Sequence, residues 1–199
     1  MRKFTLSLII ILGLLFPQYL LADNSQPDST KAVDSTKTQP EYELIPLHTK
    51  PVSATQYYEI KKNKFGIWIN NNLWIKAELG LNRESKIEFE HIGGEVQALL
   101  LYKDHKVSPE EFYETILLNA KKVSRDSKVV FNETRLVNGH EILCMRIDGT
   151  IDYVPFSYYG YYYTGFIGTI QLITIISPDL FEEYEYELTD FLDGLLINK

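Results

Sequence analysis

The sequence predicts an α+β domain, an antiparallel β-sheet of about six or seven strands with two main helices packed on it. Three observations predict this class. Seven segments have strand composition, turn sequences join some of them, and two segments repeat apolar residues at helical spacing. Because the helices interrupt and follow a run of strands, the order favours a sheet covered by helices. A signal peptide and a disordered spacer are expected before this domain.

The strand segments are rich in β-branched or aromatic residues and are bounded by Gly, Asn, Asp or Pro. They are Phe65–Ile69, Ser85–His91, Glu95–Tyr102, Val129–Val137, Glu141–Ile151, Tyr153–Tyr163 and Thr169–Ser177. Two joints between these segments have the sequence of a hairpin turn, Asn138-Gly139 and Gly165–Gly168. Asn-Gly readily takes the positive φ angles that a tight hairpin turn requires. Either Asp148-Gly149 or a bulge near Asp152 is expected to separate or bend the fifth and sixth segments.

Two helices are predicted. The first begins with a capping box, in which Ser108 accepts from the backbone and Glu111 reaches back, with proline at the first helical position. Its apolar face consists of Phe112, Ile116, Ala120 and Val123. The second helix opens at Ser177, and Gly194 is its end signal. Both are amphipathic and are expected to lie on the sheet.

The first residues have the composition of a secretory signal. Two basic residues precede an apolar run, and the small residue Ala22 lies before the expected cleavage point at Asp23. Residues 1–22 are therefore predicted to be a signal peptide. The alternative is an uncleaved membrane anchor, since the apolar stretch approaches the roughly 20 residues that a span requires, but Pro17 and Gln18 weaken it. No transmembrane span is expected in the mature chain.

A change of composition follows the signal. Residues 23–56 are rich in Ser, Thr, Pro, Gln, Asp and Lys and cannot bury enough apolar surface to offset the entropy of ordering. They are predicted to form a disordered spacer. Residues 57–199 have the length and the residue composition of one globular domain.

Charge and cysteine content limit the partners. The net charge of −7 becomes −9 when the signal is removed with Arg2 and Lys3. A negative surface repels phosphate backbones and anionic lipid, so nucleic acid is excluded as a partner and an envelope protein is favoured. The one cysteine, Cys144, can form no internal disulfide and is interpreted as a small buried hydrophobe.

The residue patterns of known catalytic sites are missing from the sequence. The four histidines have no metal-binding spacing, and there is no phosphate loop and no nucleophile elbow. Two carboxylate pairs, Glu88 with Glu90 and Asp148 with Asp152, could supply an acid and a base or bind Ca²⁺, but solvated sheet faces are the favoured interpretation. The prediction is a non-catalytic protein without cofactor or metal.

The most unusual segment is the tyrosine-rich strand. Alternation places Tyr159, Tyr161 and Tyr163 on one face, and a helix is expected to cover one of the two faces. Burial of both faces is the favoured interpretation, and an open recognition surface is the alternative. Trp68 is expected to face away from the main core. The candidate binding surface is therefore Tyr159, Tyr161, Tyr163 and Trp68.

The order of these features resembles the PsbP-like superfamily, which includes the photosystem II extrinsic subunit P, the Ran-binding Mog proteins and DcrB. The features are two early tryptophans, Phe89-Glu90-His91 on a strand, the helix after Ser108, the Asn138-Gly139 phrase, the tyrosine strand and a terminal helix. The resemblance spans about residues 57 to 197. It implies an antiparallel sheet flanked by helices and a family of binding or assembly modules without shared catalytic residues.

These observations favour an exported, periplasmic or secreted, non-catalytic binding or assembly module of the cell envelope that acts through protein–protein contact. Two alternatives remain open. One is a sugar-binding or hydrolytic module that uses the tyrosine-rich strand, and the other is a secreted inhibitor or immunity-type protein.

Overall fold

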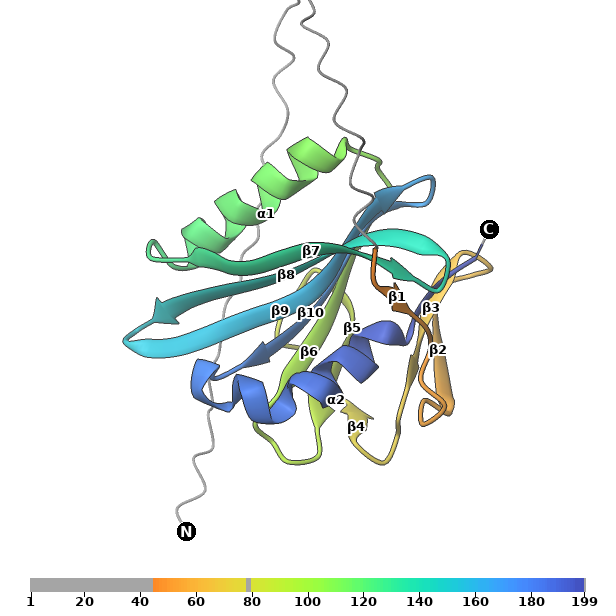
Figure 1. Ribbon diagram of the computed structural model, residues 1–199, viewed down its shortest axis with the longest axis horizontal. Coiled ribbons are helices and arrows are strands. Elements are labelled where there is room, and N and C mark those ends of the chain that lie inside the picture. Colours follow the sequence, from red (N-terminus) through yellow and green to blue (C-terminus); the bar gives the residue numbers. More distant parts are fainter. Residues whose placement is uncertain (1–44, 78–79, 199) are drawn as a thin grey trace, which may run out of the picture.

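A computed structural model describes residues 45–77 and 80–198 of the chain (Figure 1). The predicted signal peptide and residues 23–44 of the predicted spacer lie outside the described residues. Within them, the chain forms an α+β fold with a large mixed sheet, a small second sheet and two α-helices. Residues 45–56, predicted as spacer, contain β1 and the first residue of β2 and belong to this folded unit.

The large sheet has eight strands in the order β1-β7-β8-β9-β10-β6-β5-β4. β1 runs parallel to β7, and every other neighbouring pair is antiparallel. The strand bounds are β1 Leu47–His48, β4 Trp74–Lys76, β5 Ser85–His91, β6 Gln97–Lys103, β7 Lys128–Val137, β8 His140–Ile151, β9 Val154–Gly165 and β10 Gly168–Ile176.

A three-stranded sheet with the order β11-β3-β2 completes the β-structure of the described residues. Its strands are β2 Gln56–Lys61, β3 Phe65–Ile69 and β11 Leu195–Ile197. The prediction of six or seven strands in one sheet is thus too low. The additional strands β1, β4 and β11 have two or three residues each, too few for an alternating pattern, and β2 begins within the polar composition of the predicted spacer.

The hairpin turns set the register of the central strands. Asn138 and Gly139 have φ angles of 48° and 84°, as the prediction of a tight turn requires. A second turn of the same kind joins β8 to β9, since Asp152 and Tyr153 have φ angles of 49° and 67°. The chain therefore reverses at these two residues, where the sequence predicted only a break or bulge.

Two helices flank the large sheet. α1 spans Pro109–Val123, and its capping box is formed, because the Glu111 N–H donates to Ser108 Oγ at 3.2 Å and the Ser108 N–H donates to Glu111 Oε2 at 3.1 Å. A 3₁₀ turn, η1 at Pro178–Leu180, leads into α2, which spans Phe181–Asp193. The second helix thus starts a few residues later than the sequence predicted.

The helices lie on opposite faces of the large sheet, α1 above it and α2 with the small sheet below it (Figure 1). Two apolar cores result, one on each face. The alternation of β9 divides its aromatic residues between them, since Tyr159, Tyr161 and Tyr163 enter the α2-side core and Tyr158 and Tyr162 enter the α1-side core. Burial of both faces of this strand is confirmed.

Candidate functional site

The three tyrosines of the candidate binding surface are inside the protein. Tyr159, Tyr161 and Tyr163 are 1%, 0% and 6% exposed. An open recognition surface formed by these residues is therefore wrong, because α2 and the small sheet cover the face of β9 on which they lie. An exposed tyrosine is found at the β8–β9 turn instead, where Tyr153 is 98% exposed.

The hydroxyl groups of two of these tyrosines belong to a buried polar network. Tyr161 donates to Asp193 Oδ1 at 2.6 Å. One terminal nitrogen of the buried Arg135 donates to the Tyr159 hydroxyl at 2.9 Å and to the Tyr161 hydroxyl at 3.2 Å. His48 Nδ1 lies 3.1 Å from Asp193 Oδ2. The network joins β1, β7 and β9 to the end of α2.

The two tyrosines of this network are poor acids at neutral pH. Burial and the Asp193 carboxylate raise the pKa of Tyr161, and burial raises that of Tyr159. Burial also raises the pKa of the Cys144 thiol to about 12, so this fully buried cysteine is not a thiolate nucleophile. The prediction that Cys144 is a buried hydrophobe is confirmed. The polar network holds β1, β7, β9 and α2 together through hydrogen bonds.

Trp68, the fourth candidate residue, is half-buried on β3. Its ring lies 5.0 Å from that of Tyr57, and the Lys50 Nζ lies 4.9 Å from the ring centroid. It lies on the small sheet and is not part of the core that contains the three tyrosines. The four residues predicted as one binding surface are thus not brought together.

A groove on the α2 side of the large sheet is the best candidate for a site. Its volume is about 340 Å³. It is lined by Val130, Phe131, Arg146, Asp148, Tyr159, Phe181, Glu182 and Glu185. We call it the β7–α2 groove, because it runs from β7 across β8 and β9 to the first turns of α2. Of the four predicted candidates, only Tyr159 lines it.

The walls of the groove combine apolar surface with carboxylates. Val130 and Phe131 are 44% and 37% exposed, although both are large hydrophobic residues on a strand. Glu182 and Glu185, both exposed, stand on the helix opposite. A surface that offers aromatic area beside charge is typical of protein contact sites.

The one arginine of the groove is held by the protein itself. Arg146 donates to both carboxylate oxygens of Asp148, at 2.9 and 3.1 Å, and its guanidinium lies 3.9 Å from the centroid of the Phe181 ring. The Ser157 hydroxyl also donates to Asp148 at 2.6 Å. Asp148 is therefore fixed as a structural acceptor, and Glu182 and Glu185 provide the groove with negative charge.

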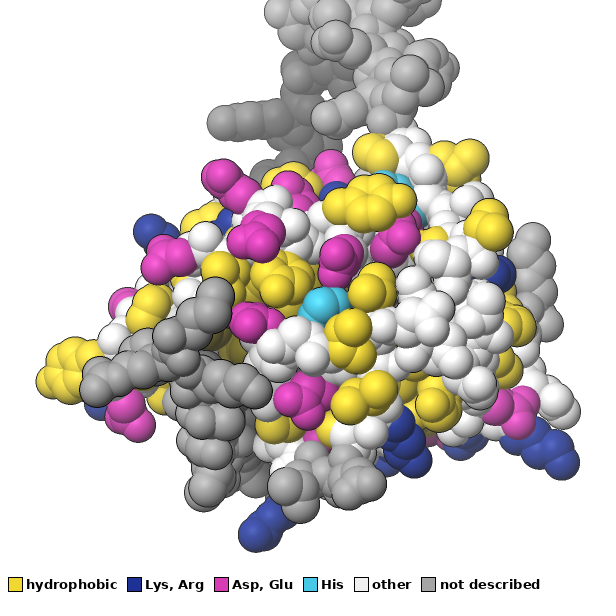
Figure 2. Space-filling model, turned by 90° about the horizontal axis from the view of Figure 1, so that it is seen from below, with side chains coloured by type: hydrophobic (Ala, Val, Ile, Leu, Met, Phe, Trp, Pro, Cys, Tyr) yellow, Lys and Arg dark blue, Asp and Glu magenta, His cyan; other side chains and the backbone are white. Residues whose placement is uncertain are grey.

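The wider face around α2 is acidic as well. Figure 2 shows carboxylate side chains gathered over the middle and upper part of this face, with Lys and Arg side chains nearer its margins. α2 contains six acidic residues and no Lys or Arg. The groove therefore opens on a surface that attracts cationic partners.

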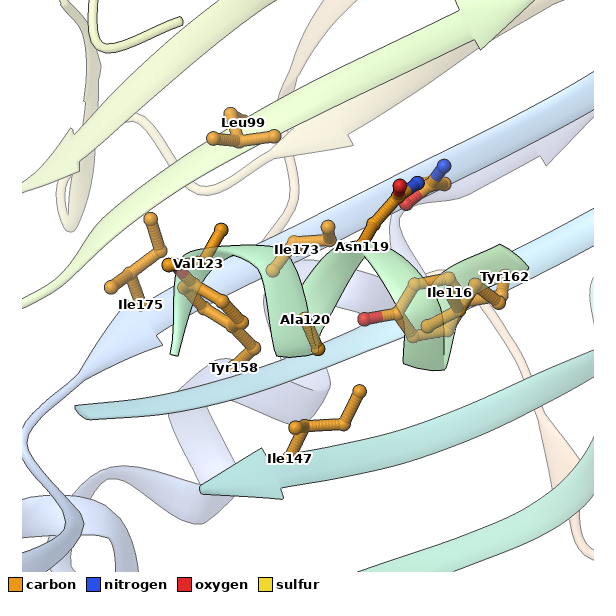
Figure 3. A pocket seen from close by; sticks show the side chains of 11 residues that line it. Leu99, Ile116, Asn119, Ala120, Val123, Ile147, Tyr158, Tyr162, Ile173 and Ile175 are labelled. Carbon is orange, nitrogen blue, oxygen red and sulfur yellow. The ribbon is translucent and has the colours of Figure 1, made fainter. Parts of the chain in front are cut away.

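A second cavity lies between α1 and the sheet (Figure 3). Its lining is almost entirely apolar, and its volume is about 30 Å³, which accommodates water but no larger ligand. Asn119 and the Tyr158 hydroxyl line it, and their polar atoms have no hydrogen-bond partner among the described residues. The cavity belongs to the packing of α1 and is not a site for a drug-sized molecule.

The carboxylates that the sequence analysis considered have other surroundings. Glu88 is buried and accepts hydrogen bonds from the backbone N–H groups of Leu81 and Asn82 and from the Ser85 hydroxyl, so it orders a loop and is not on a solvated face.

Among residues 45–77 and 80–198, no cluster of His, Cys, Asp and Glu could hold a metal ion. The same residues contain no helix that is long and apolar enough to cross a membrane.

The groove residues Phe131, Glu182 and Glu185 escaped the sequence analysis. The sequence does contain a sign that Phe131 is unusual. This aromatic residue is followed by the polar residues Asn132 and Glu133, in a strand segment that is otherwise solvated. The acidic run of α2 was visible, but only the fold shows that its first turns face β7.

Comparison with known proteins shows the fold. The solution structure of cyanobacterial PsbP (CyanoP) from Synechocystis sp. PCC 6803 matches with a TM-score of 0.57 at 10% identity, over 74% of this chain and 94% of that one. A Pseudomonas aeruginosa protein of unknown function, PA94, matches with a TM-score of 0.47 at 9% identity, over 72% and 97% of the two chains. A Bacteroides thetaiotaomicron structure has a TM-score of 0.45 at 10% identity, over 73% and 49%.

No protein-family model matches the chain, and neither does any curated protein. The likeness to PsbP is therefore one of three-dimensional structure, and it confirms the resemblance in fold that the order of sequence features indicated.

Proposed function

We propose that this chain is an exported, non-catalytic binding module of the cell envelope, periplasmic or secreted, and that it acts through protein–protein contact at the β7–α2 groove. The observation that carries the proposal is the groove itself. It exposes Val130 and Phe131 beside the carboxylates of Glu182 and Glu185, on a face where carboxylate side chains gather.

The composition of residues 1–22 supports export, and the chemistry of the groove supports binding over catalysis. Both carboxylate oxygens of Asp148 accept hydrogen bonds from Arg146, and one also accepts from Ser157, so this carboxylate is already engaged within the protein. Tyr159 closes the floor of the groove with its hydroxyl bonded to Arg135. Asp148, Arg146 and Tyr159 are thus held in position by hydrogen bonds within the protein, as a contact surface requires.

A charge-neutral variant tests the proposal. The full chain is used to capture binding partners from the envelope fraction of its own cell. It is used as wild type and as the double variant Glu182→Gln, Glu185→Gln. We expect one specific envelope protein with the wild type and at least a tenfold loss with the double variant, because cross-interface charge sets encounter and register.

The matched control is Glu110→Gln, Glu114→Gln on the exposed side of α1, which removes the same charge from the opposite face of the sheet. This control should bind as the wild type does. Equal loss in both double variants, or no specific envelope protein with the wild type, would contradict the proposal.

A further inference from the structure

β7 has an open outer edge over most of its length within the described residues. It pairs with β8 from Lys128 to Val137, but with β1 only at Leu136 and Val137. The Leu136 N–H donates outward to the Pro46 carbonyl at 2.8 Å. Because backbone groups alternate along a strand, those of Thr134 and Asn132 also point away from β8 and toward this edge.

The chain itself ends the pairing at Pro46. In the β1–β7 register the carbonyl of Thr134 faces residue 46, and proline has no N–H to donate. Within the described residues, the outer edge of β7 from Lys128 to Arg135 is therefore without a paired strand.

The open edge and the β7–α2 groove are continuous. Val130 and Phe131 line the groove and belong to the same strand, immediately before Asn132. A segment that paired with the edge would send every second side chain toward the groove side of the sheet. Backbone hydrogen bonds would then give affinity, and the groove would select the side chains.

We propose that the outer edge of β7 is a strand-addition site for an extended, basic segment of the partner protein. The inference rests on the proposed function and specifies its partner. The charge argument is that the groove contains the carboxylates of Glu182 and Glu185, whereas its one arginine, Arg146, donates its hydrogen bonds to Asp148. Lys or Arg at alternate positions of the added strand supplies the missing charge.

A synthetic peptide, acetyl-Lys-Val-Lys-Thr-Lys-Val-Lys-amide, is the probe. Its length matches the open part of β7, and its lysines share one face. When it is added to the full chain, we expect hydrogen exchange of the Asn132 and Thr134 amides to slow at least tenfold. A peptide with Glu in place of Lys should bind at least tenfold more weakly.

The decisive variant is Asn132→Pro, compared with Asn132→Ala. Proline removes the outward N–H and obstructs the edge but leaves the bonds to β8, which come from the neighbouring residues. We expect at least tenfold weaker peptide binding for Asn132→Pro and unchanged binding for Asn132→Ala. The same peptide with N-methyl groups on alternate residues tests the pairing on the wild-type chain and needs no variant to fold.

Wild-type affinity with Asn132→Pro and with the N-methylated peptide would overturn strand addition, as would equal binding of the Glu peptide. If the envelope protein is still captured in a manner that depends on Glu182 and Glu185, the proposed function stands and only the mode of binding is wrong. Loss of capture in the wild type removes both.

Discussion

The hydroxyl of Tyr161 donates a 2.6 Å hydrogen bond to Oδ1 of Asp193, which ties the middle of β9 to the last residue of α2. Both side chains are buried, and Asp193 is also approached by His48 from β1. Three elements that are distant in sequence therefore meet at one carboxylate. This contact positions α2, and with it the far wall of the β7–α2 groove.

Tyr161→Phe should lower the free energy of unfolding by about 2 kcal/mol, because a buried carboxylate loses a charged hydrogen bond. Urea denaturation at pH 7 measures the change. Tyr153→Phe removes the hydroxyl of a tyrosine that is 98% exposed, and it should change the stability by less than about 0.5 kcal/mol. Equal effects of the two substitutions would show that the Tyr161 hydroxyl contributes nothing.

Because several tyrosines are buried, we expect the folded chain to lose stability at alkaline pH. Burial raises the pKa of Tyr158, Tyr159 and Tyr161 in the folded chain, whereas an unfolded tyrosine titrates near pH 10. Above that pH the unfolded state releases protons that the folded state retains, so unfolding becomes more favourable. The free energy of unfolding should be nearly constant from pH 7 to about pH 9 and should fall from about pH 10 upward.

Urea denaturation at a series of pH values measures this dependence, and absorbance at the tyrosinate band shows when the phenols ionise. Full tyrosinate absorbance at about pH 10.5 in a chain that remains folded would mean that the tyrosines are accessible to water.

Close packing at the end of α2 gives a further prediction. A Cβ added at Gly194 would lie 1.9 Å from the backbone carbonyl oxygen of Trp68. The Trp68 N–H also donates to the Gly194 carbonyl at 2.8 Å, so the two backbones cannot separate without losing that bond. Gly194→Ala should therefore lower the free energy of unfolding by about 3 kcal/mol or prevent folding.

Gly80→Ala is the matched control, since a Cβ there meets no described atom within 4 Å. It should change the stability by less than about 0.5 kcal/mol. The midpoint of thermal unfolding by circular dichroism compares the two variants, and similar midpoints would contradict the packing at Gly194.

The fold was largely predictable because its long strands carry local signals. β7 to β10 have alternating apolar residues, glycine-containing turns join β7 to β8 and β9 to β10, and α1 has a complete capping box at Ser108. β1 was not predictable, since its two residues lie in a polar segment and their partners in β7 are about ninety positions away. Such non-local pairing leaves no periodicity to detect.

The site was harder to predict than the fold. The tyrosine-rich strand drew attention because of its composition, but composition does not tell which face a helix covers. The groove depends on the approach of Phe131 on β7 to Glu182 on α2, two residues that are brought together only by the folded sheet. The acidic character of α2 was visible from sequence, whereas its neighbour was not.

Photocrosslinking from the groove tests the central claim most directly. A photoreactive phenylalanine analogue replaces Phe131 in the full chain in its own cell, and in a second chain it replaces Leu118, an exposed residue on α1. The proposed function predicts a crosslink to one specific envelope protein from position 131 and none to that protein from position 118. A crosslink to the same protein from position 118 alone, or equally from both positions, would contradict contact at the β7–α2 groove.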